Sequence, residues 1–386
     1  MSLPLPDADG RRRIGIVMNG VTGRAGAMSH LGGALIPLRA SGGMPLKDGS
    51  VLWPEIILVG RDAGRLQTLA EQYGISRWTT SLDDALVDPQ TRIYFDSQPG
   101  LVRPAAVRAA LAAGKQVLCE KPLANDFETA LRLAQDAANA GVTNGVVQNM
   151  PLLPGVHRLI DLLRRDQLGQ VLSARIEFGY WVFQGPEPPA QRPSWNYKAE
   201  DGGGIVLDMF CHWRNMLAAL FGDVERVCAV LSTHLSERWD ELGRAFRATA
   251  EDAAYAIVIA AGIPIQLTAS WCTRVRGREL FSVHVDGVNA SAVASPSRCF
   301  MQSSADTPSV SWGSADETGD AGWKEVPVAE LVSPQRAIWA EFLSSVADDR
   351  PFRASFVEGA RDVQFAELAR LSARERCWLD VPAMTF

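Results

Sequence analysis

Hydrophobic and polar positions alternate regularly along the first 150 residues. Amphipathic segments with helical spacing separate short apolar runs, which lie at residues 14–18, 55–60, 92–97, 115–120 and 143–148. Strands that alternate with helices pair in parallel through right-handed crossovers. The pattern therefore predicts an α/β fold with a doubly wound parallel sheet of roughly six strands over residues 12–149. A stretch rich in Gly, Pro and Asp, residues 41–54, is expected to be a loop.

The pattern changes after Pro151. One amphipathic helix is expected at residues 154–168, and long β-type runs then follow one another between residues 224 and 330 without intervening helices. Consecutive strands of this kind are typical of a mostly antiparallel sheet in an α+β domain. Helical periodicity returns at residues 334–349 and 355–374.

The chain length also favours two domains. With 386 residues, the chain exceeds the ~250–300 residues at which a single hydrophobic core usually stops growing. The change of pattern gives the expected domains, residues 12–150 and residues 151–386. The helices within residues 334–374 are expected near the domain junction.

Composition narrows the class of partner. The apolar fraction is 47%, the charged fraction is 21% and the formal net charge is -6. An acidic chain offers no basic surface for nucleic acid, so a small-molecule partner is favoured. No stretch approaches the roughly 18 apolar residues of a membrane span, and the N-terminus lacks the apolar core of a signal peptide. We therefore expect a cytoplasmic protein without a membrane partner.

The six cysteines lie far apart and form no C-x-x-C pair. This spacing suits a reducing compartment and provides neither a disulfide framework nor a zinc site, so no metal is expected. We interpret all six cysteines as buried thiols.

A glycine-rich turn follows the first predicted strand. Gly20, Gly23 and Gly26 lie between that strand and the next helix, where a dinucleotide pyrophosphate site needs close backbone approach and a helix N-terminus. Met18 replaces the first glycine of the G-x-G-x-x-G fingerprint. The residues expected to bind the cofactor belong to this turn and to the ends of later strands: Asn19, Gly20, Thr22, Gly23, Arg24, Gly60, Arg61, Gln98, Pro99, Glu120 and Lys121.

The end of the second strand bears on the choice between NAD and NADP. The acidic residue that usually binds the ribose 2′-hydroxyl is missing, and Gly60 and Arg61 occupy the strand end. Because an arginine pairs with a 2′-phosphate, NADP is favoured over NAD. The alternative is that Arg61 is a solvated residue at the start of a helix and that Asp62 is its N-cap.

The strand at residues 115–120 ends in a Glu-Lys-Pro sequence. Ligands bind beyond the carboxyl ends of the strands in open parallel sheets, so Glu120 and Lys121 are expected where nicotinamide and substrate meet. A lysine there can donate to a substrate oxygen, and Glu120 either orients the lysine or contacts the cofactor. The alternative for Lys121 is an ordinary surface residue of a strand-to-helix loop.

A second group of polar residues lies on one predicted helix, residues 203–222. At about 100° per residue, Asp208, His212 and Asn215 share one face, and apolar residues occupy the other. An aspartate beside a histidine raises its basicity and fixes its orientation, as a general base for a hydroxyl proton requires. A solvated helix face and a metal site are the alternatives. The other histidines, including His30, have no comparable neighbours and are interpreted as structural.

Together these motifs resemble the glucose-fructose oxidoreductase and inositol dehydrogenase family, usually called Gfo/Idh/MocA. The resemblance covers nearly the whole chain and rests on the glycine turn, on AALAAGKQVLCEKPLA, on SWNYKAEDGGGIVLD before His212, and on FVEGARDVQFAELARLSA. Departures from the family pattern are Met18, Gln98 before Pro99, Asn215 where an aspartate is frequent, and the insertion at residues 41–53.

The resemblance implies an N-terminal Rossmann domain and a C-terminal domain with a large open sheet that often mediates homo-oligomers. It also implies NAD(P)-dependent oxidation or reduction of sugars, polyols and related compounds. The family's catalytic lysine, aspartate and histidine match Lys121, Asp208 and His212.

An aromatic loop, residues 179–201, lies between the two groups of polar residues. Trp195 and Tyr197 are candidate substrate-binding residues together with Asn215, because an aromatic and polar wall suits a sugar ring. A packed inter-domain loop is the alternative.

These observations predict an NAD(P)-dependent oxidoreductase acting on a secondary alcohol or ketone of a sugar-like substrate. An enzyme of the same fold that retains its NAD and cleaves glycosides or eliminates is one alternative, and a non-catalytic dinucleotide sensor with a protein partner is another. The GVTGRAG segment also suggests a dihydrodipicolinate reductase, but that family's His-His and K-x-D-A-P-S-G-T motifs are absent.

Overall fold

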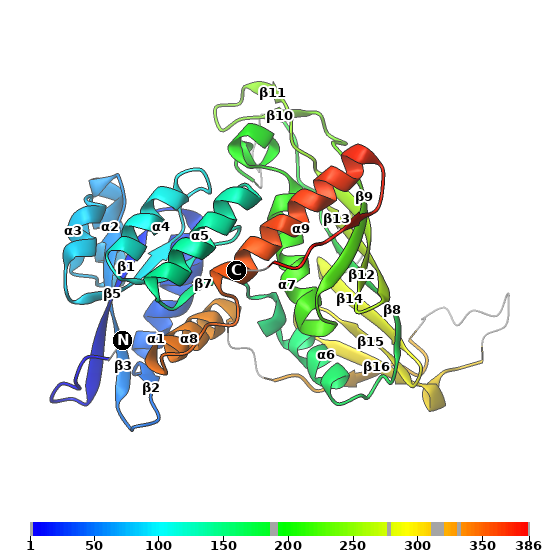
Figure 1. The fold of residues 1–386 in the computed structure, drawn as a ribbon, viewed down its shortest axis with the longest axis horizontal. Helices are drawn as coiled ribbons and strands as arrows, with labels where there is room; N and C mark the ends of the chain where they lie inside the picture. Colours follow the sequence, from blue (N-terminus) through cyan, green and yellow to red (C-terminus); the bar gives the residue numbers. More distant parts are fainter. Residues whose placement is uncertain (1–2, 186–191, 276–278, 310–319, 330–332, 385–386) are drawn as a thin grey trace. The chain divides into compact units, whose positions relative to one another are not determined.

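The computed structural model describes residues 3–185, 192–275, 279–309, 320–329 and 333–384 (Figure 1). The chain forms two compact units. The first unit combines residues 1–149 with residues 332–363, and the second combines residues 150–331 with residues 364–385. The division falls inside the long helix α9 (Phe356–Glu375).

The first unit is an α/β domain built on a seven-stranded sheet. Six strands run parallel in the order β4, β3, β1, β5, β6, β7, and β2 pairs antiparallel with β3. The predicted doubly wound parallel sheet is therefore confirmed. The strands are β1 (Arg11–Asn19), β2 (Met44–Pro45), β3 (Val51–Val59), β4 (Arg77–Thr79), β5 (Thr91–Asp96), β6 (Gln116–Cys119) and β7 (Asn144–Val146).

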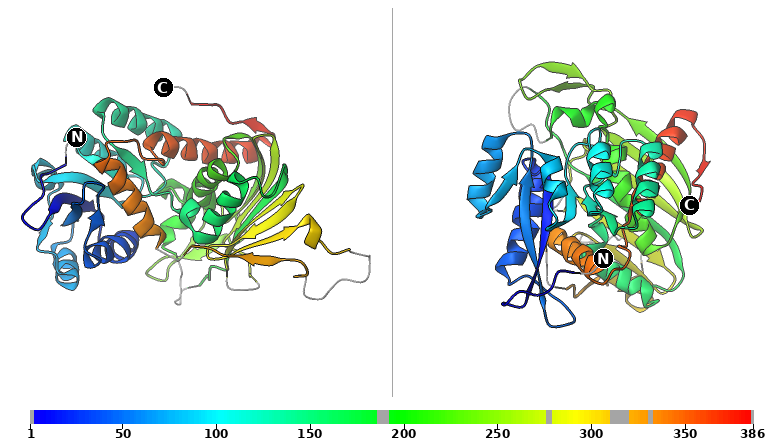
Figure 2. Two further views of the ribbon diagram at one scale, coloured as in Figure 1. Left: turned by 90° about the horizontal axis from the view of Figure 1, so that it is seen from below. Right: turned by 60° about the vertical axis from the view of Figure 1, so that its left-hand side comes forward.

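Helices cover both faces of this sheet (Figure 2). Both faces of the central strands are therefore buried: all four residues of β6 are buried, as are five of the six residues of β5. Helix α5 shows how the sequence places its helices, because its buried Ala130, Leu133, Ala134 and Ala137 follow helical spacing. The helices are η1 (Ala25–Leu35, π-helical), α1 (Ile36–Ala40), α2 (Ala63–Tyr73), α3 (Leu82–Val87), α4 (Arg103–Ala112), α5 (Phe127–Ala140) and α8 (Pro334–Ala347).

The prediction of a loop at residues 41–54 is wrong in its second half. Strand β3 already begins at Val51 and pairs along its whole length with β1, from Arg11 opposite Val51 onward. The short strand β2 turns back onto β3 as a hairpin. Prolines and glycines in this stretch mask the strand, since Pro54 lies inside β3.

A C-terminal segment completes the first unit. Trp339 and Phe342 on α8 are fully buried, and the backbone N–H of Val146 on β7 donates to the Ala354 carbonyl at 2.8 Å. The Asn144 side chain accepts the N–H of Phe356 at 2.8 Å, at the start of α9. Two of the contacts that complete the first unit therefore join residues more than 200 positions apart in the sequence.

The second unit is built on a nine-stranded sheet in the order β17, β16, β15, β14, β8, β13, β12, β9, β18. All its pairings in the described chain are antiparallel except β8 with β13, so the predicted mostly antiparallel sheet is confirmed. Its strands are β8 (Val171–Gly179), β9 (Val224–Ser232), β12 (Ala253–Ala260), β13 (Ile263–Ser270), β14 (Phe281–Gly287), β15 (Ala290–Ala294), β16 (Cys299–Ser303), β17 (Lys324–Val326) and β18 (Leu379–Asp380).

The remaining elements of the second unit are mostly short helices. The strands β10 (Glu237–Trp239) and β11 (Ala245–Arg247) form a separate hairpin. The helices are η2 (Met150–Leu152), α6 (Pro154–Arg164), η3 (Ser194–Tyr197), η4 (Ala199–Asp201), η5 (Val206–Phe210, π-helical), α7 (Cys211–Leu220) and η6 (Ser304–Asp306).

The large sheet has one covered and one open face. Along β12, Ala254, Ala256 and Val258 are buried, whereas Tyr255 and Ile257 between them are 40% and 42% exposed. Helices α6 and α7 cover the buried face in Figure 2. The alternation is the pattern expected of a half-buried antiparallel sheet.

None of the six cysteines, which all lie in the described part of the chain, forms a disulfide, but they are not all buried as predicted. Cys119, Cys211 and Cys299 are buried, Cys228 and Cys272 are half-buried, and Cys377 is exposed. Burial raises the pKa of the Cys119 thiol to about 12.

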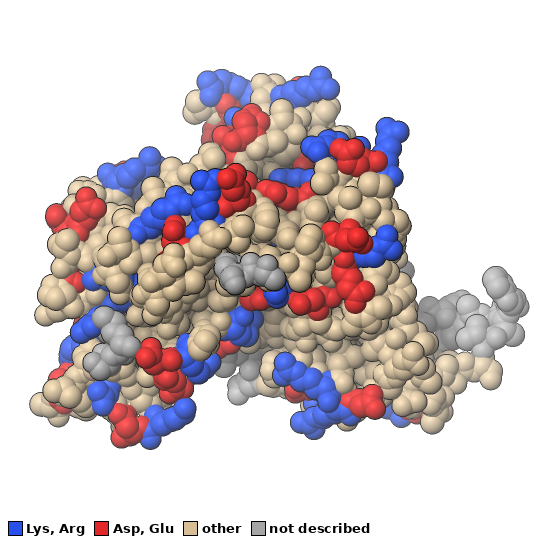
Figure 3. Space-filling view, in the orientation of Figure 1, with Lys and Arg blue, Asp and Glu red and all other residues tan. Residues whose placement is uncertain are grey.

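On the face that Figure 3 shows, Lys and Arg are interspersed with Asp and Glu. Across the described residues, no helix combines the length and the apolar character that a membrane crossing requires.

Candidate active site

Four parallel strands of the first unit end side by side. Asn19 at the end of β1 lies opposite Val59 of β3 and Asp96 of β5, and Asp96 lies opposite Cys119 of β6. Ligands of doubly wound sheets bind beyond these carboxyl ends. The predicted cofactor-binding residues follow directly after the four strands, so the fold gathers them at one edge of the sheet.

The glycine turn has the shape of a phosphate cradle. Gly20 has a φ of +72°, and a Cβ there would lie 2.8 Å from the Gln98 nitrogen. A Cβ on Gly26 would lie 2.6 Å from Ser97 Oγ, whereas a Cβ on Gly23 would meet nothing closer than 3.4 Å. Helix η1 begins without a side-chain cap. The turn therefore leaves open space and uncapped N–H groups at a helix N-terminus, which fits a dinucleotide pyrophosphate.

The Asn19 side chain connects the glycine turn to β5 and to the loop that follows it. Its Oδ1 accepts the N–H of Gly20 at 2.9 Å, and its Nδ2 donates to the Tyr94 hydroxyl at 2.9 Å and to Gln98 Oε1 at 3.1 Å. The Tyr94 hydroxyl donates in turn to Asp96 Oδ2 at 2.6 Å. Burial, together with the Asp96 carboxylate, raises the pKa of Tyr94 well above its ordinary value, so this hydroxyl stays a donor.

A buried ion pair connects this network to the Glu-Lys-Pro loop. Arg103 on α4 donates from Nε to Asp96 Oδ1 at 3.0 Å, and the two side chains are 3% and 0% exposed. The guanidinium also donates to the Gln98 carbonyl at 2.6 Å and to the Pro122 carbonyl. Burial alone would lower the pKa of Arg103, but the Asp96 charge outweighs it and raises that pKa. One arginine thus fixes the loops that follow β5 and β6.

At the end of β3, the structure assigns a role to Asp62. Its Oδ1 accepts the N–H of Arg65 at 3.0 Å, so Asp62 is the N-cap of α2, in agreement with the alternative interpretation. Arg61 is exposed beside it. The helical spacing that ends at Gly74 predicts this glycine as the C-cap of α2, and its left-handed conformation confirms the prediction. The capping-box pattern of Asn125 and Glu128 predicts Asn125 as the N-cap of α5, but this prediction is wrong, because Asp126 accepts the N–H of Thr129.

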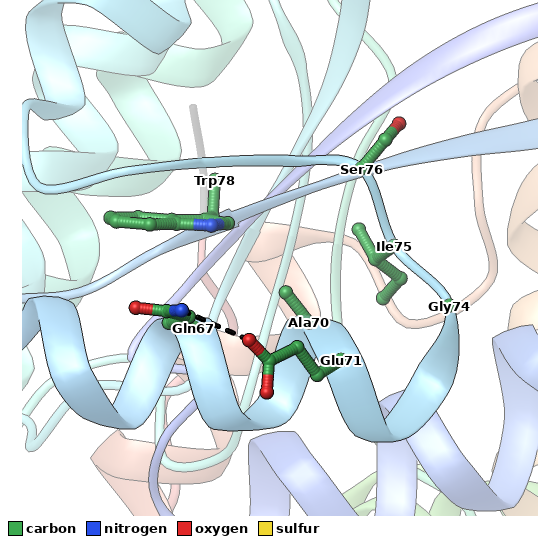
Figure 4. A pocket seen from close by; sticks show the side chains of 7 residues that line it. All are labelled: Gln67, Ala70, Glu71, Gly74, Ile75, Ser76 and Trp78. Carbon is green, nitrogen blue, oxygen red and sulfur yellow. Dashed lines mark hydrogen bonds between the residues drawn. The ribbon is translucent and has the colours of Figure 1, made fainter.

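Two open depressions flank α2. The one in Figure 4, about 480 Å³, lies between the end of α2 and β4, where Trp78 lies over Gln67, and none of the predicted site residues lines it. The other, about 430 Å³, is lined by Thr22 of the glycine turn and by Asp62. Of these two depressions, the second alone borders the predicted nucleotide site.

Glu120 and Lys121 follow β6, which ends at Cys119, one residue before the predicted end. Glu120 Oε2 accepts the backbone N–H of Lys121 at 3.1 Å, and its Oε1 lies 2.7 Å from His30 Nε2. Burial raises the pKa of Glu120, but the His30 hydrogen bond and the neighbouring cations outweigh it and lower the pKa to about 2. The interpretation of His30 as lacking an acidic neighbour is therefore wrong.

In the second unit, the Gly-Gly-Gly turn starts the helix with the predicted catalytic residues. A Cβ on Gly203 would lie 2.5 Å from the Trp195 carbonyl oxygen, and Gly204 has a φ of +108°. The Glu251 carboxylate accepts the N–H of Val206 at 3.2 Å and two hydrogen bonds from Arg370. Arg370 also donates to the Gly203 carbonyl at 2.9 Å. Backbone crowding and this ion pair explain why no side chain fits the turn.

Asp208, His212 and Asn215 lie in η5 and α7. His212 and Asn215 are each 7% exposed, so the alternative of a solvated helix face is wrong for both residues. The wheel of 100° per residue also fails across η5, because a π-helix bonds residue i to residue i+5. Asn215 Oδ1 is buried and has no hydrogen-bond partner among the described residues. The hydrogen bond between Asp208 and His212 stays a prediction.

Asp208 has a partner that sequence analysis misses. Arg192 Nη2 lies 2.8 Å from Asp208 Oδ2, and its guanidinium lies 4.3 Å over the ring of Trp271. Burial alone would lower the pKa of Arg192, but the Asp208 charge outweighs it and raises that pKa. No spacing rule connects residues 192 and 208, so the sequence carries no signal for this pair.

The aromatic loop divides into two parts, and residues 186–191 lie outside the described chain. Trp195 is 48% exposed. Tyr197 is 4% exposed, with its ring edge-on to Trp271 at 5.7 Å and the Arg238 guanidinium 4.4 Å over it. Tyr197 therefore favours the packed-loop alternative, and Trp195 keeps the exposure that a stacking residue needs.

Metal ligation finds no support in the described residues, where no three His, Cys, Asp or Glu side chains gather closely enough to hold an ion.

Two family descriptions match the chain. "Oxidoreductase family, NAD-binding Rossmann fold" matches residues 44–148, and "GFO/IDH/MocA C-terminal domain" matches residues 156–292. A D-xylose dehydrogenase from Paenarthrobacter nicotinovorans is 42% identical over 379 residues, which is 96% of this chain and 98% of that one. A levoglucosan dehydrogenase from Pseudarthrobacter phenanthrenivorans is 27% identical over 44% of this chain and 43% of that one.

Solved structures share the fold. A levoglucosan dehydrogenase in complex with NADH and L-sorbose superposes with a TM-score of 0.80 over 96% of this chain and all of that chain, at 20% identity. An aldose-aldose oxidoreductase from Caulobacter crescentus gives a TM-score of 0.75 over 96% of this chain and all of that one, at 18% identity.

Proposed function

Because the chain belongs to the Gfo/Idh/MocA family and is an NAD(P)-dependent sugar oxidoreductase, we propose that it oxidises D-xylose or a stereochemically close aldose. The observation that carries this choice of substrate is the likeness to D-xylose dehydrogenase, which extends over nearly the full length of both chains. Lys121, Asp208 and His212 are proposed as the catalytic residues.

Each proposed catalytic residue has a distinct task. A bound NAD(P)+ would supply the acceptor for the hydride, which would leave the carbinol carbon as its C–H bond breaks and the C=O bond forms. His212 takes the hydroxyl proton and becomes an imidazolium, which the Asp208 carboxylate stabilises. The Lys121 ammonium donates a hydrogen bond to a substrate oxygen and stabilises the negative charge that develops on it.

A substrate screen with two variants tests this proposal. Formation of reduced nicotinamide is measured with D-xylose, other aldoses and polyols, and we expect the highest kcat/KM with D-xylose or its close relatives. Lys121→Ala and His212→Ala should bind cofactor normally and lose roughly 10²–10⁴-fold in kcat, the usual value of acid–base catalysis. An unchanged kcat in either variant removes that residue from the mechanism.

For the cofactor, we propose a preference for NADP. The support is that Arg61 is exposed after β3, and that the nearby Asp62 carboxylate is already bonded as a helix cap, with Arg65 Nε 3.6 Å from its other oxygen. An exposed guanidinium beside a carboxylate that already accepts hydrogen bonds suits a 2′-phosphate. Dissociation constants for NAD and NADP decide the matter: Arg61→Ala should weaken NADP alone, and tighter NAD binding by the unaltered enzyme contradicts the preference.

Asn215 is the proposed substrate-orienting residue. Its buried Oδ1 lacks a partner among the described residues, and an unpaired buried acceptor is costly unless a ligand donor meets it. A sugar hydroxyl is such a donor. Asn215→Leu should raise KM for the sugar about tenfold or more, with an unchanged dissociation constant for the cofactor. An unchanged KM would assign Asn215 to packing.

For assembly, we propose a homo-oligomer through the open face of the large sheet. Val230 and Tyr255 are cross-strand neighbours on this face, and Val230, Tyr255 and Ile257 are 62%, 40% and 42% exposed. Grouped exposed apolar side chains mark interaction surfaces.

Solution mass tests the assembly. Light scattering should give a multiple of 41.9 kDa for the unaltered chain and a smaller mass for Ile257→Lys. Val288→Lys, at an exposed residue beyond the end of β14, is the matched control and should leave the mass unchanged. A monomeric unaltered chain removes the proposal.

A further inference from the structure

His30 is buried at the centre of the first unit, far in sequence from its partners. Its side chain is 0% exposed and packs against Phe95, with ring centroids 4.4 Å apart. Trp339 Nε1 lies 3.0 Å from His30 Nδ1, and His30 Nε2 lies 2.7 Å from Glu120 Oε1. Three residues from η1, α8 and the end of β6 thus form one continuous array.

The two partners fix where the proton of His30 sits. An indole N–H can only donate, so Nδ1 must accept from Trp339 and carries no proton. The single proton of the ring is then on Nε2, where it is donated to the Glu120 carboxylate. Trp339 therefore selects the one tautomer of His30 that can hold Glu120.

The array continues to the backbone of Lys121. Glu120 Oε1 is taken by His30, and Oε2 accepts the Lys121 N–H at 3.1 Å. Both carboxylate oxygens are engaged, so the Glu120 side chain has little freedom to rotate. Arg103 fixes the following residue as well, through the Pro122 carbonyl.

We propose that His30 and Trp339 are positioning residues for hydride transfer, which act through Glu120 to hold Lys121 in place. This inference rests on the proposed role of Lys121. It assigns a catalytic consequence to a tryptophan more than 200 residues beyond the Glu-Lys-Pro motif and to a fully buried histidine.

The expected loss of kcat in variants of this array follows from how strongly the rate depends on the position of a catalytic group. A misplacement of about 1 Å can cost on the order of 10²-fold in rate. Loss of a residue that orients a metal ligand costs about 10–100-fold, and we expect a similar range for a residue that orients a catalytic lysine. Trp339→Phe keeps an aromatic ring and removes only the donor, so kcat should fall about tenfold. His30→Leu removes both hydrogen bonds, so kcat should fall about 100-fold, while the Kd for NADH stays within about twofold.

Two controls separate positioning from packing. Phe342→Leu alters another fully buried residue of α8, whose ring packs edge-on to Trp339 at 6.4 Å, and should lower Tm without lowering kcat. His30→Gln retains a donor and an acceptor and should recover part of the activity that His30→Leu loses. If Trp339→Phe and His30→Leu lower Tm alone, with kcat unchanged, the array only packs and the proposal is overturned.

A double-mutant cycle distinguishes the proposed positioning role of His30 from the proposed catalytic role of Lys121. In a Lys121→Ala background, His30→Leu should cause no further loss of kcat, because it acts through the lysine. If His30→Leu lowers kcat by the same factor in this background as in the unaltered chain, His30 acts independently of Lys121 and the proposal is overturned. If Lys121→Ala alone keeps full kcat, the proposed function fails first, and this outcome is distinguishable from failure of the array.

Discussion

Replacement of Arg103 by methionine should cost the first unit several kcal/mol of stability and weaken cofactor binding. Methionine preserves most of the side-chain length and removes the guanidinium. The Asp96 carboxylate, 0% exposed, then keeps only the Tyr94 hydroxyl and the Gln98 N–H as donors among the described residues. Removing one partner of a buried ion pair usually costs about 3–5 kcal/mol, because the other charge stays buried.

The size of the unit converts this loss into a temperature shift. For a domain of roughly 150–250 residues, each kcal/mol lowers Tm by about 2–4 °C, so Arg103→Met should lower Tm by roughly 6–20 °C. The variant also frees the Gln98 and Pro122 carbonyls, which flank the predicted cofactor edge. The Kd for NADH should therefore rise, whereas a loss of global stability alone would leave this Kd unchanged.

The same helix supplies a matched control. Arg108 on α4 pairs with Asp136 at 2.9 Å, but the two side chains are 44% and 42% exposed. Exposed pairs contribute about 0–1 kcal/mol, so Arg108→Met should shift Tm by a few degrees at most and leave the NADH Kd unchanged. Scanning calorimetry and fluorescence titration check both variants. Equal shifts for Arg103→Met and Arg108→Met would refute the reasoning that burial makes the first pair important.

Three further results are expected. Gly203→Ala places a Cβ 2.5 Å from the Trp195 carbonyl oxygen, so Tm and kcat should both fall, and a normal Tm would contradict the crowding argument. Glu120 has a pKa lowered to about 2, so its carboxylate stabilises the fold above pH about 4.5 and this contribution is lost as pH falls toward 2; the Tm difference between the native chain and Glu120→Gln should shrink over that window. Iodoacetamide should modify exposed Cys377 well before buried Cys119, as read by mass spectrometry, and early modification at Cys119 would contradict its burial.

The fold can be predicted from sequence because its signals are local. Strands that are buried on both faces, such as β6, appear in the sequence as continuous apolar runs. The two ends of a helix such as α2 can be recognised from an aspartate N-cap and a glycine C-cap. Strand β3 is underestimated because Pro54 lies inside it, which propensity treats as a break. The cap of α5 is misplaced by one residue, because Asn125 and Asp126 are both good caps and only packing decides between them.

The contacts around the site are much harder to predict. The pairs Arg192 with Asp208 and Trp339 with His30 join residues from different elements, and no periodicity relates them. In the sequence, nothing distinguishes Arg103 from other basic residues of an amphipathic helix. Its buried ion pair with Asp96 becomes evident only from the structure. Sequence patterns locate where elements end, whereas the partners at those ends follow from three-dimensional packing.

The discontinuous makeup of the first unit has a consequence for how the protein is made. When the ribosome has released residues 1–149, β7 still lacks Ala354 and His30 still lacks Trp339. Almost the whole second unit must emerge before these partners arrive. Domains that are continuous in sequence can fold one after the other during synthesis, but this one has to wait for the end of the chain. The nascent first unit therefore exposes the apolar surface that α8 later covers until residues 150–331 have been synthesised.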